Sequence, residues 1–147
     1  MTRILMLLLL FTATLRAADE SSAQAAIREV MAQQQADWNS GNIDAFMQGY
    51  LRSEEIRFAS GGTVTKGWAA TIERYHTHYD TRAKMGQLQF DLLSIEVFSA
   101  DSAVVFGRWE LTRAPDEIKP NGLFTLVFRH TSDGWRIVHD HTSSADP

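Results

Sequence analysis

The chain has 147 residues, of which 44% are hydrophobic and 22% charged, and its net charge is −4. That length suits one domain, and an acidic balance with no basic stripe argues against a nucleic-acid-binding protein. The chain has no cysteine, which excludes disulfides, thiolate metal sites and a catalytic thiol. We therefore expect one small acidic domain.

The N-terminus has the layout of a secretory signal peptide. Basic Arg3 precedes an apolar run over residues 4–11, and a short segment ending in Ala17 follows. The run is shorter than the roughly 20 apolar residues that a membrane-spanning helix needs. An uncleaved anchor is the alternative.

We expect cleavage after Ala17, with cleavage after Ala18 as the alternative. The leader then covers residues 1–17 and the domain covers residues 18–147. An exported chain without cysteine fits a bacterial periplasm or exterior better than a disulfide-rich secretome. The mature protein is not expected to associate with a membrane.

Helices are predicted for the first half of the domain. Ser21 followed by Gln24 indicates a capping box, and apolar residues at helical spacing predict a first helix over about residues 22–39. A short second helix is expected over residues 43–50. A hairpin with strands at 56–59 and 64–66 comes next. A third helix carries apolar residues at spacings of four, three and four, namely Trp68, Ile72, Tyr75 and Tyr79.

Four long strands rich in β-branched and aromatic residues are predicted for the second half. They cover residues 88–98, 103–113, 122–130 and 135–143. Helices followed by a long antiparallel meander indicate an α+β fold. Such a sheet would curl around three helices and leave a pocket between them.

The last two strands are expected to join through a three-residue loop that ends in Gly134. This register pairs Thr131 with Trp135, Phe128 with Val138, Leu126 with Asp140 and Phe124 with Thr142. One face, turned toward the helices, then carries Phe124, Leu126, Phe128, Val138, Asp140 and Thr142. A two-residue Asp-Gly turn would instead group Asp140 with Val127.

Both faces of the preceding strand are partly apolar, because Val104 and Phe106 alternate with Val105 and Trp109. A sheet with two apolar faces usually has both covered. We expect a homodimer in which a second copy covers the outer face. Its buried residues would include Trp109, Val127 and Ile137.

Four motifs resemble the SnoaL-like branch of the nuclear transport factor 2-like superfamily. They cover residues 38–46, 67–68, 107–112 and 134–143, and the resemblance extends over residues 22–143. It implies a cone formed by one strongly bent antiparallel sheet wrapped by three helices, an internal pocket, and dimers. The chain is also similar to the association domain of calcium/calmodulin-dependent kinases.

The resemblance specifies function poorly, because the superfamily includes isomerases, cyclases, dehydratases, hydrolases, ligand binders and assembly domains. The general base of its ketosteroid isomerases falls near Ala59 or Ser60 of this chain, and their first-helix tyrosine falls near Gln34. Neither position can perform that chemistry. A plain steroid isomerase is therefore disfavoured.

Asp140 is the strongest catalytic candidate, because apolar neighbours would desolvate its carboxylate and raise its pKa. The SnoaL-like cyclases similarly place a catalytic acid on a late strand. Alternatively, Asp140 is a structural partner of Arg108 or of a backbone amide. His76 is a weaker candidate for a base at the pocket mouth.

Arg108 and Glu110 share a strand face and could form a polar floor with Asp140, or neutralise each other. His139 and His141 lack a third metal ligand and face away from the pocket in this register. No metal and no cofactor are expected. The remaining predicted wall residues are Trp38, Tyr50, Tyr75, Tyr79, Phe124, Leu126 and Thr142.

The leading functional hypothesis is a pocket that binds a small, largely apolar molecule with one polar end. An alternative is a proton-transfer enzyme of the isomerase, cyclase or dehydratase type that uses Asp140 as general acid and base. A second alternative is a structural dimerisation module.

Overall fold

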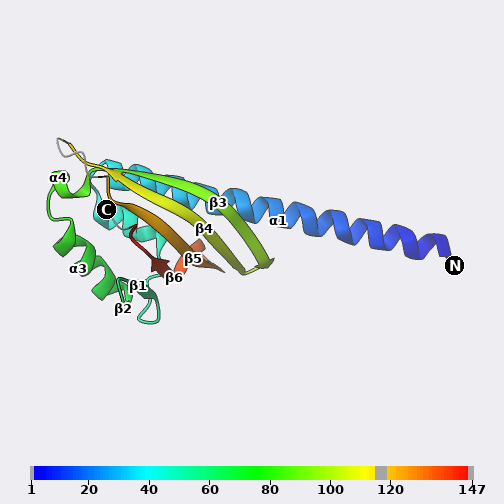
Figure 1. Ribbon diagram of the computed structural model, residues 1–147. Helices are drawn as coiled ribbons and strands as arrows, with labels where there is room; N and C mark the ends of the chain where they lie inside the picture. Colours follow the sequence, from blue (N-terminus) through cyan, green and yellow to red (C-terminus); the bar gives the residue numbers. More distant parts are fainter. Residues whose placement is uncertain (1, 115–118, 146–147) are drawn as a thin grey trace.

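The computed structural model describes residues 2–114 and 119–145, with side chains described from residue 19 onward. One strongly curled six-stranded sheet packs against helices from the N-terminal half (Figure 1). The helices are α1 (Thr2–Asn39), α2 (Ile43–Phe46), the 3-10 helix η1 (Met47–Gly49), α3 (Trp68–His78) and α4 (Arg82–Met85). The strands are β1 (Arg57–Ser60), β2 (Thr63–Lys66), β3 (Gln87–Ser99), β4 (Ser102–Thr112), β5 (Asn121–Thr131) and β6 (Gly134–Thr142). The predicted α+β class is confirmed.

The strands lie in the order β2-β1-β6-β5-β4-β3. All neighbouring pairs are antiparallel except β1 and β6, which run parallel. The expectation of a wholly antiparallel sheet is wrong at this pair. No tight hairpin joins β1 to β6, so nothing local imposes the antiparallel direction on them.

Helix α1 begins at Thr2, so Ser21 lies inside the helix and does not cap it. The predicted helix start near residue 22 is therefore wrong for this chain, because the preceding leucines and alanines are themselves strong helix formers. The predicted apolar stripe is present, with Ile27, Met31 and Trp38 buried on one face. In the part of the chain that the structure describes, no helix is long and apolar enough to cross a membrane.

Helix α1 covers the free edge of β3. The Phe90 backbone N–H donates to Gln35 Oε1 at 2.7 Å, and the Leu88 N–H donates to Asn39 Oδ1 at 2.6 Å. Edge strands leave such groups open to pairing with other chains. The amide side chains of α1 satisfy them and hold the helix against the sheet.

The loop between β5 and β6 differs from the prediction. Thr131 pairs with Gly134, so the loop has two residues instead of three. Gly134 has a φ of 93°, a backbone conformation that glycine adopts without strain. A shorter loop shifts the first pairs of the hairpin by one residue.

A β-bulge then corrects the register of this hairpin. Phe128 pairs with Ile137 instead of Val138, and the extra residue of the bulge lies on β6. Beyond the bulge, Leu126 pairs with Asp140 and Phe124 pairs with Thr142, as predicted. The register shift from the shorter loop is therefore reversed by the bulge before Asp140, so the predicted pairs of Asp140 and Thr142 are present.

The inner face of the sheet holds the core, where Phe128, Val105 and Ile137 are at most 1% exposed. Ile137 and Trp109 both belong to this inner face, so their expected place at an outer interface is wrong. The shorter loop turns Ile137 inward. Gly107 lies opposite inward-facing Phe124, and Trp109 lies two residues further along β4, so it is on the same face as Gly107.

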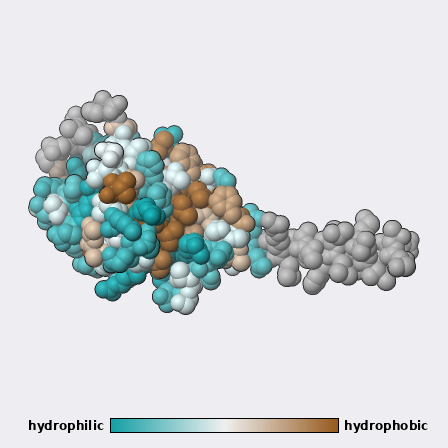
Figure 2. Space-filling model, turned by 90° about the horizontal axis from the view of Figure 1, so that it is seen from below, coloured by the Kyte–Doolittle hydropathy of each residue, from teal (hydrophilic) through white to brown (hydrophobic). Residues whose placement is uncertain are grey.

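The outer face of the sheet is partly apolar, as predicted. Phe106 and Leu123 are each 37% exposed there, and partly buried Val127 lies on the same side. Figure 2 shows apolar side chains gathered in one band across a face that is otherwise largely hydrophilic. Over the described residues, the other large exposed apolar side chains are Val64, Leu93 and Phe98.

Candidate functional site

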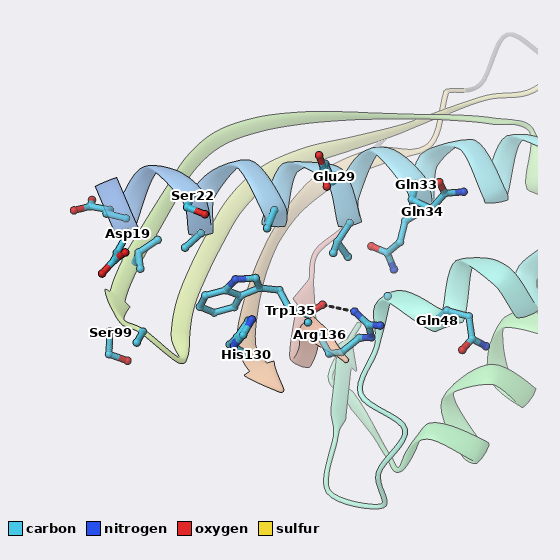
Figure 3. A pocket seen from close by; sticks show the side chains of 18 of the residues that line it. Asp19, Ser22, Glu29, Gln33, Gln34, Gln48, Ser99, His130, Trp135 and Arg136 are labelled. Atoms are coloured by element: carbon cyan, nitrogen blue, oxygen red, sulfur yellow. Dashed lines mark hydrogen bonds between the residues drawn. The ribbon is translucent and has the colours of Figure 1, made fainter. Parts of the chain in front are cut away.

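The described part of the chain contains an open groove and a smaller cavity. The larger one, of about 1060 Å³, is an open groove between α1 and the β5–β6 hairpin (Figure 3). Its acidic and basic side chains, such as Glu29 and His130, lie at the surface. Arg136 Nη1 there donates to the carbonyl of its neighbour Trp135 at 2.8 Å. No buried titratable group lines the described part of this groove.

The smaller hollow is a cavity of about 220 Å³ between the inner face of the sheet, α1 and α3. It collects side chains from segments far apart in the sequence. Of the predicted site residues, those that line it are Trp38, Tyr50, Tyr75, Tyr79, Phe124, Leu126, Asp140 and Thr142. The structure therefore brings eight predicted residues together, while their roles stay predictions.

Aromatic rings form one side of this cavity. The Trp38 ring meets the Tyr79 ring edge to face at 4.7 Å between centroids, and Phe46 meets Tyr75 in the same way at 5.2 Å. Trp38 Nε1 donates to the Met85 carbonyl at 3.2 Å, which fixes the indole. Such edge-to-face contacts stabilise the arrangement of the rings.

Asp140 is the acidic group of the cavity. Tyr50 Oη donates to Asp140 Oδ2 and Thr142 Oγ1 donates to Asp140 Oδ1, each at 2.6 Å. The Tyr50 and Tyr75 hydroxyls lie 3.3 Å apart. Phe58 on β1 and Leu126 on β5 are the neighbours of Asp140 across the sheet. The carboxylate thus has two hydroxyl partners within apolar surroundings.

Burial raises the pKa of Asp140 from 3.8 to about 6, although the hydrogen bonds from Thr142 and Tyr50 and the nearby His141 oppose the shift. Burial also raises the pKa of the Tyr50 hydroxyl well above 10, and the charge of Asp140 adds to that effect. Asp140 is therefore the group in this network that can exchange a proton near neutral pH.

The predicted polar floor of Arg108, Glu110 and Asp140 does not exist. Arg108 is exposed on the outer face, opposite Leu123. Glu110 Oε1 lies 3.8 Å from Lys119 Nζ. Since Gly107 faces Phe124 inside the sheet, the alternation of β4 turns both charged side chains outward. The structural alternative that paired Asp140 with Arg108 is wrong for the same reason.

The expectation that His76 reaches the pocket mouth is also wrong. His76 is exposed on α3, with Nε2 3.5 Å from Asp44 Oδ1, and it does not line the cavity. Arg74 and His78, one turn apart, line the cavity instead. They share a helix face with the inward-pointing tyrosines, whereas His76 falls on another face.

Several wall residues were not predicted from the sequence, including Phe58, Phe90 and Trp109. Alternation offered a signal for Phe58, because Ile56 and Phe58 are both buried on one side of a short strand. Ser60 and Gln34, at or beside the positions that the resemblance assigned to the base and tyrosine of steroid isomerases, also line the cavity. They bring no carboxylate or phenol to it.

No group of three or more metal-binding side chains is close enough to hold an ion, within the residues described. His139 and His141 lie on the outer face of β6, opposite Val127 and Thr125. The cavity lining offers one buried carboxylate, several phenols and aromatic walls, together with the side chains of Arg74 and His78.

The model of the SnoaL-like domain matches residues 27–147. The chain belongs to the SnoaL-like family. A solved structure of an NTF2-like protein of unknown function from Shewanella oneidensis is 36% identical, with a TM-score of 0.77, and the match covers 82% of this chain and 98% of that one. Comparison with curated proteins found no match.

Solved structures of lower sequence identity share the fold. A protein from Thiobacillus denitrificans that is like the association domain of calcium/calmodulin-dependent protein kinase type II is 21% identical, with a TM-score of 0.67, covering 80% of this chain and 93% of that one. A ketosteroid isomerase-like protein from Erwinia carotovora is 18% identical, with a TM-score of 0.65, covering 84% and 96%. The predicted resemblance is thereby confirmed at the level of family and fold.

Proposed function

We propose that this protein binds a small, largely apolar molecule with one polar end in the 220 Å³ cavity. The observation that carries the proposal is a hollow walled mainly by aromatic and aliphatic side chains around one buried carboxylate, Asp140. Ligand sites commonly combine apolar walls with a few placed polar groups. An apolar cavity of about 150 Å³ holds benzene, so this one suits a substituted single ring.

Filling the cavity tests this proposal. Leu126→Phe adds bulk to the cavity wall, whereas Leu123→Phe makes the same change on the outer face of the same strand. Titration with 2-phenylethanol, followed through tryptophan fluorescence, should show saturable binding to wild type and to Leu123→Phe. Binding should weaken at least about tenfold in Leu126→Phe. Equal affinities in the two variants would place the probe elsewhere.

Proton transfer is the second candidate function, because Asp140 has a pKa of about 6 inside a ligand-sized cavity. The simplest reaction is removal of a proton next to a carbonyl by the Asp140 carboxylate and its return to the same or a neighbouring carbon. Phenylacetone in D₂O should then exchange its α protons faster with wild type than with Asp140→Asn. Asp91→Asn, which removes an exposed carboxylate, is the matched control.

Export is part of the proposal. The basic start and apolar run support a leader over residues 1–17, and the SnoaL-like match begins only at residue 27. N-terminal sequencing of the exported protein should return Ala18 as the first residue. Recovery of Met1 would contradict the export proposal.

A homodimer through the outer sheet face is also proposed, supported by exposed Phe106 and Leu123 beside Val127. Leu123→Glu should yield a folded monomer in sedimentation at micromolar concentration. Val64→Glu, on β2, is the control and should remain dimeric. If the protein is a dimer that binds none of the small probes, the result would instead favour the alternative function of a structural dimerisation module.

A further inference from the structure

The hydrogen-bond network in the cavity has a defined direction. When Asp140 is ionised it only accepts, and the single hydroxyl protons of Tyr50 and Thr142 both point to it. Tyr50 has then no proton left for Tyr75. In the 3.3 Å contact between these two tyrosines, the Tyr75 hydroxyl is therefore the donor.

This direction leaves only acceptors around Asp140. The free lone pairs belong to the two carboxylate oxygens and to the Tyr75 oxygen, whose own proton is already used. A ligand group placed here has to donate hydrogen bonds. Within this network of Asp140, Tyr50, Thr142 and Tyr75, a carbonyl or a carboxylate on the ligand would find no free donor.

The carboxylate also has no cationic partner. No ion pair of Asp140 with a lysine, arginine or histidine occurs among the described residues. Arg74 lines the cavity, but it is partly exposed and its guanidinium carbon lies 5.1 Å from the centre of the Phe58 ring. Exposed His78 and Ser144 line the cavity too and mark its open end.

The aromatic walls, like the carboxylate, favour a positively charged ligand group. Ring faces carry partial negative charge and attract ammonium groups, by about 0.5–2 kcal/mol in general. Trp38, Phe46 and Tyr75 line the cavity and pack against one another. A cation bound in the cavity would have the Asp140 carboxylate and a largely aromatic wall as its surroundings.

We infer that the polar end of the ligand is a protonated amine that binds Asp140, carried on a small aromatic or aliphatic body. This inference rests on the proposed function and adds the ligand class to it. Its three protons match the acceptors that the network leaves free.

Three probes with the same phenyl ring and two-atom arm test the inference: 2-phenylethylamine, 2-phenylethanol and phenylacetate. Each is titrated at neutral pH into wild type, Asp140→Asn and the matched control Asp91→Asn, by calorimetry. Wild type and the control should bind the amine about tenfold tighter than the alcohol. Phenylacetate should bind most weakly. Asp140→Asn should lose the preference for the amine and keep its affinity for the alcohol.

The outcomes separate the two levels of the proposal. If none of the probes binds, the proposed function itself fails. If the alcohol or phenylacetate binds wild type as tightly as the amine, the cavity binds ligands and only the amine inference is overturned. An amine preference that survives in Asp140→Asn also overturns it. Should Asp140→Asn not fold, the order of the three probes on wild type still decides.

Discussion

The two faces of the curled sheet come from the same strands and are both partly apolar in sequence, yet they differ in burial and in what packs against them. On β5, Phe124, Leu126 and Phe128 point inward and are at most 4% exposed, whereas Leu123 points outward and is 37% exposed. The inner face packs against helices and encloses Asp140. Packing against the helices, more than amino-acid composition, therefore distinguishes the inner face and its cavity from the exposed outer face.

Truncating one phenylalanine on each face should give the largest difference. Phe128→Ala removes a fully buried ring and should lower the free energy of unfolding by about 3–5 kcal/mol. Phe106→Ala, on the outer face of β4, should cost less than about 1 kcal/mol in the monomeric Leu123→Glu background, where no second copy covers the ring. Urea unfolding followed by tryptophan fluorescence measures both. In that background, a cost at Phe106 as large as that at Phe128 would show that the Phe106 ring is buried within a single chain.

Replacing Asp140 should change the pH dependence of stability. Its folded-state pKa of about 6 lies above 3.8, so between these values the folded chain holds a proton that the unfolded chain has released. Stability from this group is therefore fully present below pH 3.8 and is lost as the pH rises through about 6. The loss corresponds to roughly 3 kcal/mol.

Asp140→Asn removes that dependence. The unfolding free energy of wild type should fall relative to that of this variant by about 2–2.5 kcal/mol between pH 4 and pH 7. Asp91→Asn should follow the wild-type curve, because an exposed carboxylate stays hydrated in both states. Parallel curves for Asp140→Asn and wild type would contradict a buried, destabilised carboxylate.

The fold was predictable because its signals are local and redundant. Long alternating strands, a helical stripe from Ile27 to Trp38 and the spacing of Tyr75 and Tyr79 each determine an element by themselves. The register in which two strands pair is determined less locally than the strands themselves. The β5–β6 loop is shorter than predicted and a bulge compensates for it, so Asp140 faces Leu126 for a reason that the sequence did not reveal.

The face assignment of β4 shows why part of the site could not be predicted. Val104 and Phe106 on one face are as apolar as Val105 and Trp109 on the other, so the pattern does not choose between them. The contact that decides is between strands. A Cβ on Gly107 would lie 2.5 Å from the Phe124 ring, so glycine must face that ring and Arg108 must point outward.

Two arginines give the finest test of the contrast between the faces. Arg74→Gln and Arg108→Gln remove the same charge, the first from the cavity lining and the second from the outer face. Both are partly or fully exposed, so each substitution should change the free energy of unfolding by no more than about 0.5 kcal/mol.

The two substitutions should nevertheless differ in their effect on the affinity for 2-phenylethylamine. Loss of Arg74 removes a like charge near the bound ammonium and should tighten binding by about two- to threefold, since charges near the surface are largely screened. Loss of Arg108 should leave the affinity unchanged, because the sheet lies between its side chain and Asp140. If Arg108→Gln weakens binding instead, the charged face of β4 contributes to the site after all, and the separation of the two faces fails at this strand.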